Sequence, residues 1–193
     1  MRSLVFGCAA AILLGAFASP VARAAVTHSG APPVQKLYER TYGSWIYRCA
    51  EVTPSGQKPI RSCQILQQMV VKKDGHDIPL ATLIFEKANN QAGYDLSAIL
   101  PLGILLPAGV SFSTDTGSPI TKVVDFCTEG GCVIIPQSSE GLVDELRDGK
   151  KGRIQFVYMN GRKITVNFVL NGFSDAMNAF DKGDLPPEVK KTL

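Results

Sequence analysis

The sequence predicts an antiparallel β-sandwich with two short helices and two disulfide bonds. Short runs of aromatic and branched residues recur along the chain, and turn residues separate them, which is typical of all-β sandwiches. Two segments, near residues 140–147 and 173–181, carry apolar residues at helical spacing instead. Four cysteines follow the first 24 residues, and an even number of cysteines is typical of a small exported domain stabilised by disulfides.

The first 24 residues have the pattern of a secretory signal peptide. Arg2 gives a positive start, an uncharged and mostly apolar stretch covers residues 4–18, and Ala22-Arg23-Ala24 places small residues at the −3 and −1 positions of a cleavage site. The apolar stretch is shorter than the roughly 20 residues that cross a bilayer. We therefore expect cleavage after Ala24, rather than a retained anchor, and no transmembrane span in the mature chain.

The charge of the mature chain is small. Loss of the leader removes two of the 20 Lys and Arg residues and none of the 17 Asp and Glu residues, so 18 cations face 17 anions. A nucleic-acid partner usually requires a dense basic patch, and we predict no such partner.

The rest of the chain is predicted to form one domain with loose ends. Residues 25–41 have little apolar periodicity and contain adjacent prolines, which indicates a flexible lead-in that ends in a helical turn at residues 34–40. The β-sandwich domain is expected over residues 42–182. Lys182-Gly183-Asp184 and two later prolines predict a loose C-terminal tail over residues 183–193.

Strand-like segments follow in order from residue 45. The predicted strands are residues 45–49, 62–71, 80–86, 110–113, 122–127, 132–136, 154–159 and 163–170. In the second strand, Cys63, Ile65, Met69 and Val71 are expected on one face. Trp45, the only tryptophan, is expected in the core against a disulfide rather than on a ligand-binding surface.

The last two predicted strands form a hairpin around Asn160-Gly161. A three-residue loop at 159–161 pairs Phe156 with Ile164 and places the apolar side chains of both strands on one face, whereas a two-residue turn separates them. Because burial selects the first register, we predict the three-residue loop, with a positive φ at Gly161 only.

The four cysteines are predicted to form local disulfides. Cys49 and Cys63 bracket a turn-like Pro-Ser-Gly sequence, and Cys127 and Cys132 bracket Glu-Gly-Gly. This pairing is favoured over the other two connectivities. A zinc site is disfavoured because the second pair lacks C-x-x-C spacing and a nearby histidine.

One apolar segment fits neither a helix nor a regular strand. Residues 99–110 are uncharged, but proline or glycine interrupts them every few residues. One interpretation is an extended connection that buries its leucines beneath the sheets. The other is an exposed surface that contacts a partner, or an apolar lining for a ligand. The residues that would form this partner or ligand surface are Leu100, Leu102, Ile104, Leu105 and Leu106.

The sequence contains no recognisable catalytic motif. His76, the only histidine outside the lead-in, lies between Asp74 and Asp77 at a predicted hairpin tip. A solvated turn residue is a simpler interpretation of this position than a metal ligand or a member of a catalytic triad. No serine lies in a G-x-S-x-G sequence, and no carboxylate stands out as half of a glycosidase pair. We predict no catalytic residue, metal or cofactor.

Several short motifs occur together in one order along the chain. They are Gly43-Ser44-Trp45, Cys49, Cys63-Gln64-Ile65, the sequence PLGILLPAGV at residues 101–110, Phe126-Cys127, Gly131-Cys132, and Val169 to Phe173 followed by Ala176. Through them the chain resembles the invasion-associated locus B (IalB) family of exported bacterial proteins from about residue 42 to 180. Asn171 departs from the resemblance, because the family is more often basic there. The resemblance implies a periplasmic or surface-associated β domain of a Gram-negative bacterium and brings no catalytic residues.

We therefore expect a non-enzymatic envelope protein that acts by binding or as a structural component. Its partner would be an envelope protein or a host-surface molecule. The alternatives are a periplasmic protein that binds a small molecule or lipid, and a carboxylate-dependent hydrolase. We expect the protein in the periplasm, with outer-membrane association or secretion as alternatives.

Overall fold

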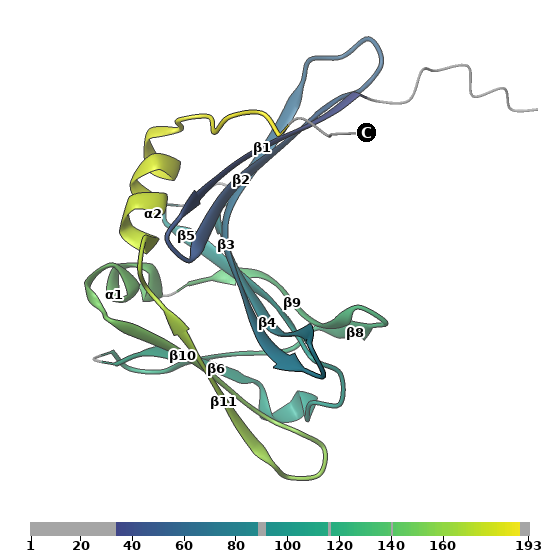
Figure 1. The fold of residues 1–193 in the computed structure, drawn as a ribbon, viewed down its shortest axis with the longest axis vertical. Coiled ribbons are helices and arrows are strands. Elements are labelled where there is room, and N and C mark those ends of the chain that lie inside the picture. Colours follow the sequence, from purple (N-terminus) through teal and green to yellow (C-terminus); the bar gives the residue numbers. More distant parts are fainter. Residues whose placement is uncertain (1–33, 89–91, 116, 140, 190–193) are drawn as a thin grey trace, which may run out of the picture. The chain divides into compact units, whose positions relative to one another are not determined.

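The computed structural model describes residues 34–88, 92–115, 117–139 and 141–189 (Figure 1). The predicted signal peptide, its cleavage site and the first part of the lead-in lie outside the described residues.

Two antiparallel sheets contain the described strands. The strands are β1 Val34–Tyr42, β2 Trp45–Thr53, β3 Ile60–Lys73, β4 His76–Lys87, β5 Tyr94–Leu100, β6 Val110–Thr114, β7 Ile120–Lys122, β8 Phe126–Thr128, β9 Gly131–Ser138, β10 Lys151–Val157 and β11 Lys163–Val169. The larger sheet has the order β1-β2-β3-β4-β5-β9-β8, and the smaller has the order β11-β10-β6-β7. Two short helices, α1 Leu142–Asp148 and α2 Phe173–Lys182, complete the predicted fold, which is confirmed.

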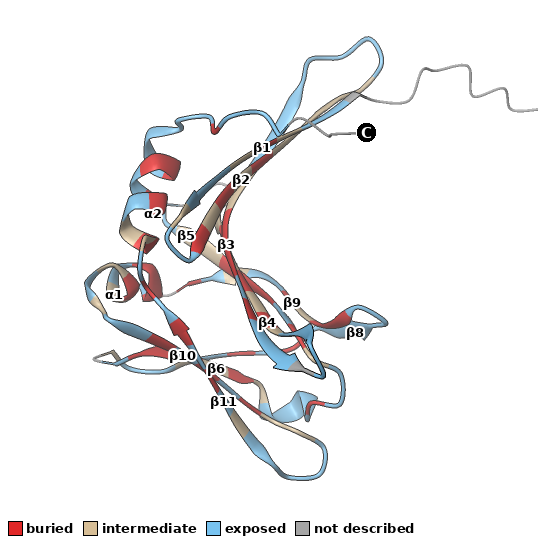
Figure 2. Ribbon diagram, in the orientation of Figure 1, coloured by how far each residue is buried: buried red, intermediate tan, exposed pale blue. Residues whose placement is uncertain are grey.

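The core is made by the alternating apolar positions of both sheets and by the helices, as Figure 2 shows in red. Trp45 is completely buried. Its ring centre lies 4.6 Å from that of Phe173, and 6.0 and 6.1 Å from those of Phe85 and Phe168. Its indole N–H donates a hydrogen bond to the Val169 carbonyl at 3.0 Å. Trp45 is therefore a core residue, as predicted, and its ring contacts are phenylalanines.

The two helices are joined by a polar contact and cover the core. In α2, the buried residues are Phe173, Ala176, Met177, Ala179 and Phe180. Arg147 of α1 donates to the Asp181 carboxylate at 2.7 Å, and the Ser174 hydroxyl donates to the Arg147 carbonyl. These bonds fix α1 against α2.

The β10–β11 hairpin has the predicted register. Phe156 lies opposite Ile164, and Ile154 lies opposite Val166. The Gly161 N–H donates to the Tyr158 carbonyl at 2.8 Å, and Gly161 has a φ of +81°, whereas Asn160 does not have a positive φ. Burial of both apolar sets on one face of the hairpin thus explains the three-residue loop, as predicted from the sequence.

The described parts of both predicted loose ends pair with other segments. The expected helical turn at residues 34–40 is wrong, because these residues pair with β2 along the whole of β1. In the expected loose tail, Glu188 bridges to Tyr38, and Val189 donates to the Leu37 carbonyl at 2.7 Å. Strand pairing with a distant segment overrides the weak local pattern at both ends.

Three strand predictions in the middle of the chain also need correction. Strand β5 was not predicted, although Leu96, Ala98 and Leu100 are buried along it. The expectation that residues 99–110 contain no regular strand is therefore wrong for residues 99 and 100, which end β5. The predicted strand at residues 122–127 is two strands, because β7 pairs in the smaller sheet and β8 in the larger. Val71 is exposed, since a register shift after Met69 separates it from the inward face of β3.

Candidate functional site

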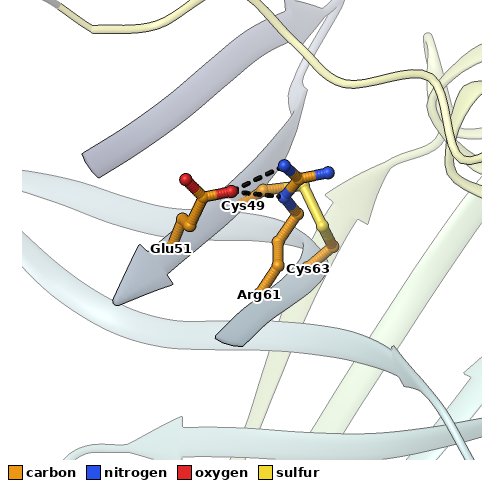
Figure 3. The surroundings of a disulfide bond; sticks show 4 residues. All are labelled: Cys49, Glu51, Arg61 and Cys63. Atoms are coloured by element: carbon orange, nitrogen blue, oxygen red, sulfur yellow. Dashed lines mark hydrogen bonds and ion pairs between the residues drawn. A yellow bond between two sulfur atoms is a disulfide. The ribbon is translucent and has the colours of Figure 1, made fainter. Parts of the chain in front are cut away.

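The two disulfides join Cys49 to Cys63 and Cys127 to Cys132, the pairing expected from the sequence. Each bridges residues that lie directly opposite one another in neighbouring strands. Beside the first, Arg61 forms an ion pair with Glu51, with a guanidinium nitrogen 2.6 Å from a carboxylate oxygen (Figure 3). These cysteines act as cross-strand links.

The predicted histidine turn lies on an exposed hairpin. His76 begins β4 on the exposed β3–β4 hairpin, and the neighbouring Asp77 is paired with Lys72 at 2.9 Å. Within the described ranges, no three His, Cys, Asp or Glu side chains are grouped to hold a metal ion.

The apolar segment at residues 99–110 is divided between core and surface. Leu100 and Ile104 are buried, so the expectation that they lie on a partner surface is wrong. Leu102, Leu105 and Leu106 are exposed to 53%, 41% and 37%, so the expectation that the segment buries its leucines fails for these three. This segment therefore contributes side chains to the core and to the surface.

Hydrogen bonds to the β10–β11 hairpin hold this segment in place. The Leu105 N–H donates to the Val157 carbonyl at 2.7 Å, and the Met159 N–H donates to the Gly103 carbonyl at 2.9 Å. Gly103 has a φ of +84°, a conformation that favours glycine, and this turn directs Ile104 inward after the exposed Leu102. The leucines are thus presented by a fixed loop.

The same contacts bring a further apolar residue to the surface. Met159, at the tip of the β10–β11 hairpin, is exposed to 74%. We call Leu102, Leu105, Leu106 and Met159 the apolar end. Beside it, the Arg162 guanidinium lies 5.4 Å from the centre of the Tyr158 ring. Sequence reasoning did not identify Met159, because only the pairing of its hairpin with the 103–105 loop places it there.

The β3–β4 hairpin adds exposed aliphatic residues next to the apolar end. Val70, Val71 and Ile78 are exposed, and Val71 lies opposite Ile78. Residues 79–82 in the middle of β4 and Pro101 line one hollow of about 200 Å³, which places β4 beside the segment at residue 101. Figure 1 shows the β3–β4 and β10–β11 hairpins extending toward the lower part of the view.

Four surface hollows of the described chain are small. Their volumes are about 200, 240, 290 and 370 Å³, at or below the lower part of the range of roughly 300–1,000 Å³ for ligand pockets. Leu102, Leu105 and Leu106 line none of these four, whereas Met159 lines the hollow of about 370 Å³ together with Gly103, Tyr158 and Arg162. The leucines face outward rather than into a ligand cavity.

Two carboxyl groups with shifted pKa values, Glu86 and Asp115, lie away from the apolar end. The carboxyl pKa that is raised belongs to Glu86, through burial first and then through the charge of Asp95, which lies directly opposite on β5. Backbone N–H groups of Lys150 and Lys151 hold the pKa of Asp115 below its usual value. Neither carboxylate lies on the loops that form the apolar end.

No helix among the described residues is long enough and apolar enough to span a membrane.

Comparison with known proteins identifies the family of the chain. The family model for the Invasion associated locus B (IalB) protein matches residues 45–181. The crystal structure of invasion associated protein B from Bartonella henselae is similar, with a TM-score of 0.59 and 25% sequence identity over 75% of this chain and 98% of that one. A search of curated proteins finds no match. Because the family match covers most of its length, the chain belongs to the IalB family.

Proposed function

We propose that this protein is a non-enzymatic binding protein of the bacterial envelope, which contacts its partner through the apolar end. Two disulfides and membership of the IalB family support an extracytoplasmic location. Within that location we propose the periplasm, in association with the outer membrane.

The observation that carries this proposal is the clustering of exposed aliphatic side chains on fixed loops. Single exposed apolar residues are normal on a protein surface, whereas groups of them mark interaction sites. Leu102 and Met159 come from different parts of the chain, and hydrogen bonds between their two loops hold them together. Transfer of such side chains out of water on binding contributes about 1.5–3 kcal/mol for each one fully buried.

Binding of purified protein to envelope fractions tests the proposal. We expect Leu102→Asp and Met159→Asp each to weaken binding about tenfold, because burial of one such side chain is worth at least 1.4 kcal/mol. Ile60→Asp is the matched control, since Ile60 is 62% exposed but lies at the β2–β3 turn, away from the apolar end. Equal binding by all variants, or an equal loss in the control, would contradict the proposal.

A further inference from the structure

The chain around the apolar end has an unbalanced charge. Between Asp148 and Asp175 the sequence contains Lys150, Lys151, Arg153, Arg162 and Lys163 and no acidic residue. The mature chain as a whole carries only one cation more than its anions, so the remainder is net acidic. The excess positive charge is therefore concentrated on the β10–β11 hairpin and the residues next to it.

The structure leaves these cations exposed, on the outward faces of β10 and β11 and, for Arg162, over the Tyr158 ring at the hairpin tip. The Asp115 carboxylate, which accepts from the Lys150 and Lys151 N–H groups, lies at the end of the hairpin away from this tip. Lys151 and Arg153 share the outward face of β10, and Arg153 lies between the uncharged Ser113 and Asn167 of the neighbouring strands. Lys163 begins β11 next to Arg162, directly after the hairpin tip. In the described part of the chain, none of these four residues forms an ion pair with a carboxylate.

The β3–β4 hairpin beside the apolar end is balanced in charge. Lys72 is paired there with Asp77, and the turn between them holds one further lysine and one further aspartate. This hairpin supplies exposed aliphatic residues without opposing the charge of the β10–β11 hairpin.

We propose that the apolar end and the β10–β11 hairpin together dock the protein on an anionic lipid bilayer. This inference rests on the proposed function and names its partner. Met159 and the exposed leucines enter the boundary between headgroups and acyl chains, and Arg162 and Lys163 contact lipid phosphates, as in other interfacial anchors. Lys151 lies about 20 Å farther along the strand, at a rise of about 3.3 Å per residue, so it contributes long-range attraction that salt screens.

A lipid surface fits this end better than a folded protein partner does. Stable protein interfaces bury about 800 Å² per partner around anchors that are enriched in Trp, Tyr and Arg. Here the exposed apolar side chains are aliphatic and lie on separate turns, with Met159 at a hairpin tip and the Tyr158–Arg162 contact beside it. Apolar tips of this kind can insert between lipids without needing a complementary surface.

Vesicle flotation with the full mature protein tests the inference. The probes are vesicles of phosphatidylcholine alone and of phosphatidylcholine mixed with phosphatidylglycerol. We expect tighter binding to the mixed vesicles, weakened by salt. Leu102→Asp and Met159→Asp should each reduce binding to mixed vesicles about tenfold. Replacement of Arg162 and Lys163 by Gln should reduce binding to mixed vesicles about tenfold and leave binding to neutral vesicles unchanged.

Two control variants test whether these effects are specific. Ile60→Asp and Lys58→Gln remove an exposed aliphatic and an exposed cationic residue at the β2–β3 turn, and we expect both to bind like the wild type. Circular dichroism checks that each variant folds. Absence of vesicle binding, or equal binding by tip and control variants, would overturn the inference. If vesicles do not bind but envelope fractions still bind in a Met159-dependent manner, the partner is a protein and the proposed function stands. If binding to envelope fractions does not depend on Met159 either, the proposed function and this inference are both wrong.

Discussion

At the scale of single residues, the β1–β2 turn packs backbone against backbone on the loop before α2. A Cβ atom at Gly172 would lie 2.0 Å from the Tyr42 carbonyl oxygen, and one at Gly43 would lie 2.5 Å from the Asn171 carbonyl oxygen. The Ser44 N–H donates to that same Asn171 carbonyl at 3.1 Å. Asn171 therefore contributes through its backbone carbonyl. This contact does not require the basic side chain that is more frequent at this position in the family.

Gly172→Ala should destabilise the fold far more than Gly161→Ala. Both glycines have a φ near +80°, so each substitution carries the roughly 1–2 kcal/mol penalty of a left-handed residue. A Cβ at Gly161 meets no atom within 4 Å, whereas at Gly172 it collides with backbone. We expect a loss of about 1 kcal/mol for Gly161→Ala and more than 3 kcal/mol for Gly172→Ala in urea unfolding. Equal losses would show that the turn and the loop are not in contact.

Glu86→Gln should stabilise the protein near neutral pH. Burial raises the pKa of Glu86, and Asp95 on the opposite strand raises it further. Between the ordinary carboxyl pKa and this raised value the folded state binds a proton that the unfolded state lacks, so stability falls as pH rises through that window. Removing the charge should raise the free energy of unfolding by about 0.5 kcal/mol above the window.

The pH dependence and an opposing variant check this prediction. Below about pH 4.3, where the carboxyl is protonated in both states, the gain from Glu86→Gln should vanish. Glu51→Gln should act in the opposite direction near neutral pH, because it removes the ion pair with Arg61. A stabilisation by Glu86→Gln that is independent of pH would mean that charge is not its cause.

At the scale of elements, the hairpins and their cross-strand links could be predicted where a local constraint was strong. The register of β10 and β11 followed from keeping Phe156 and Ile164 on one face, and the cysteine pairs followed from their spacing around turns. The strand character of residues 34–42 and the division of residues 122–127 could not be predicted. Both depend on which distant strand pairs with them, and a local pattern carries little of that information.

Removing the first disulfide should destabilise the protein more than removing the second. In the loop-entropy model, closing the 14-residue separation between Cys49 and Cys63 contributes about 3 kcal/mol, and closing the 5-residue separation between Cys127 and Cys132 contributes about 2 kcal/mol. Cys49 and Cys132 are both buried, so each pair leaves some unfilled space and the order rests on loop length. Urea unfolding of the two Cys→Ala double variants measures both values. A larger loss for the Cys127 pair would contradict this order.

At the scale of the whole molecule, the sequence could predict the family and the fold more completely than the site. It identified the segment at residues 99–110, but it could not show which leucines are exposed. That distribution depends on the turn at Gly103 and on hydrogen bonds to β10. Met159 was not predicted at all, because its exposure beside the leucines exists only after the two loops pair.

Export makes a prediction about the mature chain. If the signal peptide is cleaved after Ala24, the intact mass of protein recovered from the periplasm should correspond to a chain that begins at Ala25. Its four remaining cysteines should be unreactive to thiol reagents until reduction, because all four are in disulfides. A retained leader, or a reactive thiol in the unreduced mature protein, would count against export through this route.

The central claim is that the apolar end is the binding surface, and photocrosslinking in intact cells tests it most directly. A photoreactive phenylalanine analogue is placed at position 159, and in a matched strain at position 60, which is similarly exposed. We predict adducts with an envelope component from position 159, lost when Leu102→Asp is added, and none above background from position 60. Equal crosslinking from both positions, or none from position 159, would contradict the account.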